Sequence, residues 1–116
     1  MQALEDWAFD MVPQPVSGIL LLFPIKDASE AYRDEERTRI ESGGQTLSEN
    51  VYFMKQTIGN ACGTIGILHC MANARTDFAA SGADPVIAPD SYLHRLFNAT
   101  HAMSAADRGS YLEQVQ

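Results

Sequence analysis

The stretch VYFMKQTIGNACGTIGILHCM, residues 51–71, organises the interpretation of the whole chain. It begins as an extended or strand-like segment, passes through Gly59 and Asn60, and continues into an apolar run that starts at Cys62. Asn is a preferred residue at the N-cap of a helix, and Asn60 in that position would place Cys62 in the first turn. The sequence therefore predicts a helix over residues 62–74 with a thiol at its positive end.

The predicted position of Cys62 suits nucleophilic chemistry. A helix N-terminus favours the thiolate, which is the reactive form of cysteine. Gly63 leaves space beside the sulfur for a substrate carbonyl, and the N–H groups of the first turn can donate to a developing oxyanion. Gln56, six residues before Cys62, can supply a side-chain amide as a second donor. The pattern indicates acyl transfer.

A purely structural role for these residues is the alternative, and spacing alone favours it. Free cysteine is among the most buried residue types, and residues 62–74 are apolar nearly all round, which is typical of a buried core helix. Cys70 lies two turns into this helix and is expected in the core. The Cα atoms of Cys62 and Cys70 would be about 12 Å apart, which is too far for a disulfide. Unpaired thiols favour a reducing compartment.

No histidine of the chain is placed to activate a thiol at Cys62. Such a nucleophile normally needs a histidine base that is oriented by Asp or Asn. His69 lies about 10 Å along the helix from Cys62, too far to act. His94 and His101 share one face of a later helix and are expected at the surface or half buried. No Cys and His have the spacing of metal ligands, so no metal site is expected.

The rest of the chain predicts an α+β fold that is mostly helical. The run ILLLF at residues 19–23, between Gly18 and Pro24, is typical of a buried central strand. Because few other segments can pair with it, the chain resembles part of a larger domain. Four further helices are expected. The first, over residues 3–12, has the apolar stripe Leu4, Trp7, Ala8 and Met11, and the second, over residues 27–41, is solvated, with Asp27 and Glu30 at capping-box spacing. The third opens at Pro89 or Asp90, after a loop over residues 76–88, and buries Leu93, Leu96, Phe97, Thr100 and Met103; the fourth is capped by Ser104, with Asp107 three residues on, and buries Tyr111, Leu112 and Val115.

The composition narrows the function classes. The 116 residues are 46% hydrophobic and 20% charged, as expected for one small folded domain. A net charge of -7 argues against nucleic-acid binding. No apolar run approaches the length of a membrane span, and the first residues, MQALEDWAFDM, lack the basic region of a secretory signal. A cytoplasmic location, or also a nuclear one, is expected.

The segment VYFMKQTIGNACGTIGILH closely resembles the signature of the ubiquitin C-terminal hydrolases, the papain-like cysteine deubiquitinases of peptidase family C12. The resemblance extends outward over residues 11–114. MVPQPVSGILLLFPI resembles the first central strand region of the family, AYRDEERTRIESGGQ the charged helix after it, and AMSAADRGSYLEQ the helix before its crossover loop. The resemblance implies a papain-like cysteine peptidase fold, of which residues 1–116 form an incomplete, mostly helical portion with one central buried strand.

The resemblance also implies roles for single residues. Cys62 matches the catalytic nucleophile and Gln56 the oxyanion-hole side chain, acting on thioester, ester or (iso)peptide bonds at the C-terminal glycine of ubiquitin. It implies no cofactor, no metal, the ubiquitin tail as partner, and a monomer for the complete domain. The catalytic His and Asp of the family follow the crossover loop, beyond this chain, and none of His69, His94 or His101 matches that His. The chain is thus expected to be a nucleophile half that is inactive alone; the alternatives are a truncated, non-catalytic ubiquitin-binding fragment and a fragment that does not fold stably by itself.

Overall fold

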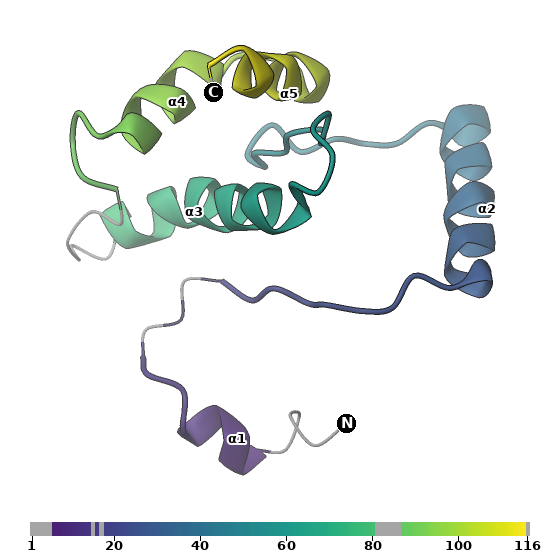
Figure 1. The fold of residues 1–116 in the computed structure, drawn as a ribbon, viewed down its shortest axis with the longest axis horizontal. Helices are drawn as coiled ribbons and strands as arrows, with labels where there is room; N and C mark the ends of the chain where they lie inside the picture. The colour runs from purple at the N-terminus through teal and green to yellow at the C-terminus, as the bar shows by residue number, and fades with distance from the viewer. Residues whose placement is uncertain (1–5, 15, 17, 81–86, 116) are drawn as a thin grey trace. The chain divides into compact units, whose positions relative to one another are not determined.

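The structure is a computed structural model that describes residues 6–14, 16, 18–80 and 87–115. The described part is helical and contains no β-strand. Its helices are α1 (Asp6–Asp10), α2 (Asp27–Gly43), α3 (Cys62–Ala80), α4 (Tyr92–Thr100) and α5 (Ala105–Gln114) (Figure 1). The chain divides into two compact units, one of residues 21–51 and one of residues 1–20 and 52–116. The expected helical character is therefore confirmed, whereas the expected strand is not formed.

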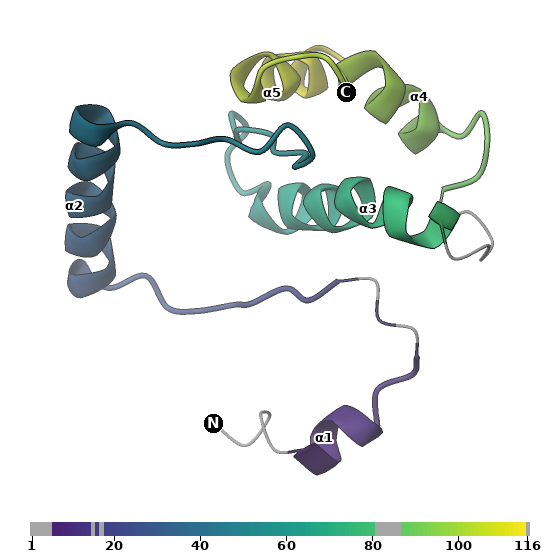
Figure 2. The same cartoon turned by 180° about the vertical axis from the view of Figure 1, so that it is seen from behind.

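The hydrophobic core lies in the second unit, where α3, α4 and α5 meet an extended segment over residues 52–57. Figure 1 shows α4 and α5 on the same side of α3, and Figure 2 shows from behind that the extended segment runs between α3 and α5. Phe97 and Met54 are the largest fully buried hydrophobic side chains. Tyr52 packs edge-on against Phe97, with ring centroids 5.3 Å apart. The buried cluster consists of Met54, Ile65, Leu68, Ile87, Leu96, Phe97 and Leu112.

The two C-terminal helices form as their sequences predict. α4 begins at Tyr92, two or three residues later than expected, because Ser91 is its N-cap and its hydroxyl accepts a hydrogen bond from His94 N at 3.2 Å. The predicted cap of α5 is confirmed, since Ser104 Oγ accepts from Asp107 N at 3.2 Å. The apolar stripe of α4 is buried at Leu96, Phe97 and Thr100. These helices follow local patterns because caps and an amphipathic face act within one element.

The helix that begins at Cys62, α3, is longer and less buried than its sequence predicts. α3 continues to Ala80, so the predicted loop over residues 76–88 begins with helix, and residues 81–86 lie outside the described part. Ile65 and Leu68 are buried, but Ile67 is 50% exposed. The prediction of a fully buried core helix is therefore wrong. The core cluster packs against the side of α3 that carries Ile65 and Leu68, and Gly18 and Leu20 lie against Cys70 and Gly66.

The apolar run at residues 19–23 adopts no strand and is largely exposed. Leu22 is 94% exposed. Gly18 lies against α3, where a Cβ would come within 2.8 Å of Cys70 Sγ. The predicted central strand is not formed in the described structure, which gives residues 19–23 no β-strand and no paired neighbour. The residue types of a buried strand are present without the neighbours that would bury them.

The N-terminal helix ends earlier than predicted, and the described residues of its apolar stripe are mostly exposed. α1 has five residues, and Trp7 and Met11 are 60% and 74% exposed. Leu4, the first residue of the predicted stripe, lies outside the described residues. A five-residue helix is too short to be stable from its own hydrogen bonds, so its form depends on packing. Among the described side chains of α1, only Ala8 is partly covered.

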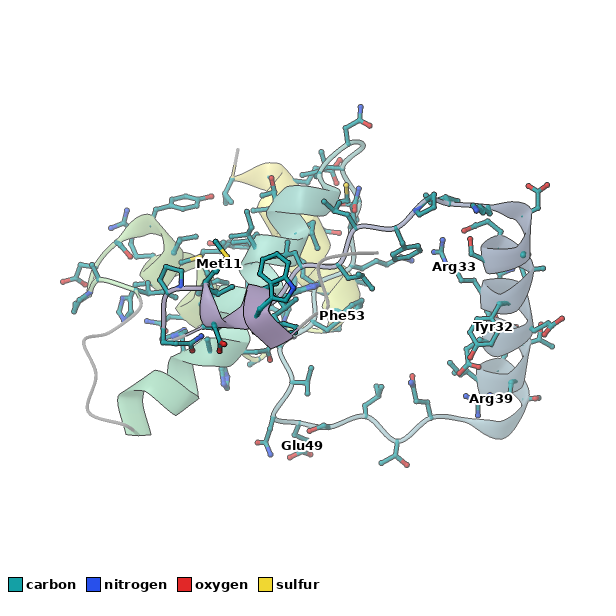
Figure 3. The ribbon with its side chains drawn as sticks, turned by 90° about the horizontal axis from the view of Figure 1, so that it is seen from below. Met11, Tyr32, Arg33, Arg39, Glu49 and Phe53 are labelled. Atoms are coloured by element: carbon teal, nitrogen blue, oxygen red, sulfur yellow. The ribbon has the colours of Figure 1, made fainter. Side chains whose placement is uncertain are left out.

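The second helix is solvated, as predicted. α2 has no buried residue, and its arginines pair with acids one turn earlier at three-residue spacing, as in the pair of Arg39 and Glu36 (Arg39 is labelled in Figure 3). The hydrogen bond from Arg39 lowers the pKa of Glu36, so its contribution to stability is present above the ordinary carboxyl pKa and is lost as pH falls. The predicted capping box is wrong: Asp27 is already helical, and Ser29 Oγ accepts from Lys26 N at 3.0 Å.

Within the described residues, no helix combines the length and apolar character needed to cross a membrane.

Replacing Gly109 by alanine is expected to destabilise the unit that contains α3. A Cβ at this position of α5 would overlap the carbonyl oxygen of Lys55 and come within 3.1 Å of Thr57 Cγ2. Alanine gains about 1 kcal/mol of helix propensity, but overlap with a backbone atom forces a shift that costs about 1–3 kcal/mol or more. Chemical denaturation followed by circular dichroism measures the net loss. Gly63→Ala is the matched control, because a Cβ there meets nothing within 4 Å; equal stability of both variants would contradict the close approach.

Candidate active site

The turn before α3 places Cys62 as the first helical residue. Ile65 N donates to Ala61 O at 2.9 Å, so Ala61 holds the cap position. The prediction of Asn60 as the N-cap is therefore wrong by one residue. Asn60 instead has a φ of 57°, a left-handed conformation that asparagine adopts more readily than most residues. The predicted location of Cys62 in the first turn is unchanged by this shift.

The thiol of Cys62 is accessible. Cys62 is exposed and unpaired, whereas Cys70 is half buried and also unpaired. A Cβ at Gly63 would meet nothing within 4 Å, so the space beside the sulfur is open. The backbone N–H of the first helical residue has no intrahelical acceptor. A substrate carbonyl can therefore reach the sulfur and a backbone donor at the same helix end.

Gln56 is exposed and its side chain is held in one orientation. Its Nε2 donates to Ile58 O at 2.9 Å, two residues further along the turn that leads to Cys62. A primary amide carries two N–H donors, and this bond uses one of them. The second N–H can donate to an anion that develops near the start of α3. The amide is thus turned with its nitrogen, rather than its oxygen, on the side of the turn.

The three histidines make contacts elsewhere in the described residues, and none of their hydrogen bonds reaches Cys62. His69 Nε2 accepts from Met54 N at 2.9 Å, and its ring stacks on Phe53 with centroids 4.9 Å apart (Phe53 is labelled in Figure 3). His94 Nδ1 accepts from Asp90 N, just before α4, and its Nε2 contacts Asn98 Nδ2 on the same helix. His101 is exposed, and its carbonyl accepts from Arg108. The described residues also hold no cluster of three acidic, His or Cys groups suited to a metal ion.

α5 holds the segment that carries Gln56 from one side. Lys55 N donates to Ala105 O at 2.8 Å, and Arg108 Nη1 donates to Phe53 O at 2.9 Å. Arg108 also lies over the ring of Tyr52, 4.2 Å from its centroid. Arg108 was not predicted as important from the sequence, because its partners are backbone oxygens of residues far away in the chain.

α3 holds the same segment from the other side through polar side chains. His69 binds Met54 and Asn73 binds Tyr52, each through the backbone of the extended residue. The sequence analysis assigned His69 to packing, and it does pack, but Asn73 was missed. The only sequence signal is that two polar residues stand four apart on an otherwise apolar helix, which places them on one face.

Cys62 is expected to react with iodoacetamide about tenfold faster than Cys70. The exposed thiol of Cys62 has the access that alkylation needs, whereas Cys70 is half covered beside Gly18. Peptide mass spectrometry after timed alkylation of the folded chain measures both rates. Cys62→Ser is the control that assigns the fast phase; faster labelling of Cys70 would contradict this placement.

Comparison with known proteins gives one family and several relatives that carry its name. The sequence model described as "Ubiquitin carboxyl-terminal hydrolase, family 1" matches residues 1–116. The chain is 41% identical over 110 residues to "Ubiquitin carboxyl-terminal hydrolase 3" of Arabidopsis thaliana, covering 95% of this chain and 43% of that protein. It is 37% identical over 111 residues to human "Ubiquitin carboxyl-terminal hydrolase isozyme L1", covering 96% of this chain and 46% of that protein. It is 49% identical over 70 residues to "Probable ubiquitin carboxyl-terminal hydrolase" of Dictyostelium discoideum, covering 60% of this chain and 28% of that protein.

The chain thus spans less than half the length of these relatives. The match to the family nevertheless runs over the whole chain and includes the segment around the exposed thiol at the start of α3. The resemblance inferred from the sequence is confirmed, and the chain belongs to family 1 of the ubiquitin carboxyl-terminal hydrolases.

Proposed function

We propose that this chain is the nucleophile half of a cysteine deubiquitinase domain that cleaves thioester, ester or (iso)peptide bonds at the C-terminal glycine of ubiquitin. The observation that carries the proposal is the exposed Cys62 at the first residue of α3, in a chain that matches the hydrolase family throughout. The ubiquitin tail is the proposed partner. The chemistry uses side chains and backbone, so the proposal includes no cofactor.

The proposed reaction proceeds by nucleophilic catalysis. The Cys62 thiolate attacks the glycine carbonyl, and the oxyanion that forms accepts hydrogen bonds from the Cys62 N–H and from Gln56 Nε2. Collapse of this intermediate expels the leaving group and leaves a thioester, which water then hydrolyses. The open space beside Gly63 supports this role because the scissile bond must approach the sulfur closely.

A base is the missing part of this proposed mechanism. The three histidines bond other groups in the described residues, so none is in place to take the thiol proton. General base catalysis contributes about 10²–10⁴-fold in rate. The complete domain is proposed to have the papain-like fold, in which the apolar residues 19–23 become a paired, buried strand and further elements supply the His and Asp. The unpaired thiols support a cytoplasmic or nuclear site of action. We also propose that the complete domain is a monomer.

The chain alone is expected to release a fluorophore from the C-terminus of ubiquitin at least about 10²-fold more slowly than the human relative, because it lacks the base. Fluorescence under single-turnover conditions measures the rate, with Cys62→Ala as the blank. Turnover near that of the relative, lost in Cys62→Ala, would show that a base is present after all.

Covalent capture tests the nucleophile separately. Ubiquitin whose C-terminal glycine is an aldehyde is expected to form a reversible hemithioacetal with Cys62, since addition of a thiol to an aldehyde needs no leaving group. Native mass spectrometry detects the adduct, and competition with excess thiol shows that it is reversible. Cys70→Ser should retain it and Cys62→Ser should lose it; an adduct at Cys70 would overturn the assignment.

A non-catalytic ubiquitin-binding fragment is the second candidate, favoured by the absence of any histidine bond to Cys62 among the described residues. This candidate predicts saturable binding of ubiquitin by the chain without a covalent adduct. Isothermal titration of ubiquitin with the Cys62→Ala variant measures it. Binding without aldehyde capture by the wild-type chain favours this function over the first.

A further inference from the structure

Asn73 pairs with the backbone of Tyr52 as a neighbouring strand would. Tyr52 N donates to Asn73 Oδ1 at 2.8 Å, and Asn73 Nδ2 donates to Tyr52 O at 2.9 Å. A primary amide offers the same donor and acceptor as a peptide group, so both polar atoms of residue 52 are satisfied by one side chain. Asn73 Nδ2 also donates to His69 O at 2.8 Å, which fixes the amide against its own helix. The Asn73 amide is therefore held by the backbone of Tyr52 and by the backbone of its own helix.

His69 contacts the backbone of Met54 one helical turn earlier. Its Nε2 accepts from Met54 N at 2.9 Å, and the same nitrogen lies 3.2 Å from Met54 O, to which it cannot donate while it accepts. The spacing of the two contacts matches, because four helical residues rise about 6 Å and two extended residues span about 6.6 Å. The pairs Tyr52 with Asn73 and Met54 with His69 define an antiparallel register between the extended segment and α3.

This register determines where Gln56 arrives. Continuing it by one further step sets residue 56 opposite residue 65, in the turn of α3 that follows Cys62. Gln56 and the Cys62 thiol therefore stand at the same end of the same helix because of two side chains further along that helix. The bonds of Lys55 N and Phe53 O hold the segment against a different helix, α5.

We propose that Asn73 is a positioning residue for the oxyanion hole, acting through Gln56. It holds the extended segment in the register that brings the Gln56 amide beside the start of α3. The inference rests on the proposed function, because it presumes that Gln56 donates to an oxyanion on a Cys62 adduct. Asn73 itself contacts the protein backbone and not the substrate.

The equilibrium between the chain and ubiquitin bearing a C-terminal aldehyde tests this role. In the adduct, Cys62 Sγ forms a bond to the aldehyde carbon, the carbonyl π bond becomes a C–O single bond, and the thiol proton ends on that oxygen. The net addition needs no histidine base and releases no group. Its dissociation constant therefore reports how well the hole accommodates the tetrahedral oxygen.

A double-mutant cycle separates positioning from general loss of structure. Gln56→Ala is expected to raise the dissociation constant about 10²-fold, the effect of one oxyanion donor. Asn73→Ala is expected to raise it about tenfold in the wild-type background, and not at all in the Gln56→Ala background, because no side-chain donor is then left to position. Equal effects of Asn73→Ala in both backgrounds would overturn the inference.

Two further variants keep the test decisive if Asn73→Ala folds poorly. Asn73→Asp keeps the acceptor for Tyr52 N and loses the donors, so an intermediate rise of a few fold is expected, again absent with Gln56→Ala. Asn98→Ala is the matched control: Asn98 is exposed on α4, accepts from Arg75 Nη2 at 3.3 Å, and should leave the dissociation constant unchanged. An effect of Asn98→Ala as large as that of Asn73→Ala would overturn the inference.

The outcomes distinguish this inference from the function on which it rests. A wild-type chain that forms no adduct, or one whose adduct is indifferent to Gln56→Ala, overturns the proposed catalytic function and the inference with it. An adduct that depends on Gln56 and is indifferent to Asn73→Ala overturns the positioning role alone.

Discussion

The extended segment at residues 52–57 lacks a neighbouring strand, and its backbone polar groups must find partners elsewhere. Buried or half-buried N–H and C=O groups are costly to leave unpaired, so every such group needs an acceptor or donor. Here the side chains of His69 and Asn73 serve on one side and the start of α5 serves on the other. The segment is thus fixed by polar contacts from both neighbours, and the core side chain of Met54 is sealed between them.

This constraint connects the core to the site. The same helix that presents Cys62 at its first residue also holds the segment that carries Gln56, so the two candidate groups share one rigid support. A support of this kind suits an oxyanion hole, in which donors must be in place before charge develops. Arg108 adds a further clamp by donating to three carbonyl oxygens, those of Phe53, Thr100 and His101.

The apolar residues 19–23 also form an extended segment, but no strand pairs with their backbone N–H and C=O groups in the described structure. Their side chains are those of a strand buried on both faces, yet Leu22 is almost fully exposed and the backbone has no strand beside it among the described residues. Residues 52–57 escape this condition because polar side chains of α3 substitute for a strand. Residues 18 and 20 lie against Cys70 and Gly66 of α3, and neither of these two residues has an amide or imidazole side chain that could pair with a backbone. The difference explains why one extended segment is ordered into the core and the other is not.

Local chemistry in the sequence determined the start of α5 at Ser104, the solvated character of α2, the buried stripe of α4, and the location of Cys62 in a first helical turn. These features depend on neighbours within one or two turns, which the sequence shows directly. Tertiary structure alone decided that Asn73 and His69 bind an extended segment, that α3 is exposed at Ile67, and that the run at residues 19–23 is exposed. Asn60 lies between these cases: its type indicated a cap, but only the structure showed that the cap is Ala61, one residue later. The physical reason is that burial and backbone pairing depend on which distant segments meet, and residue type specifies the need for a partner but not its identity.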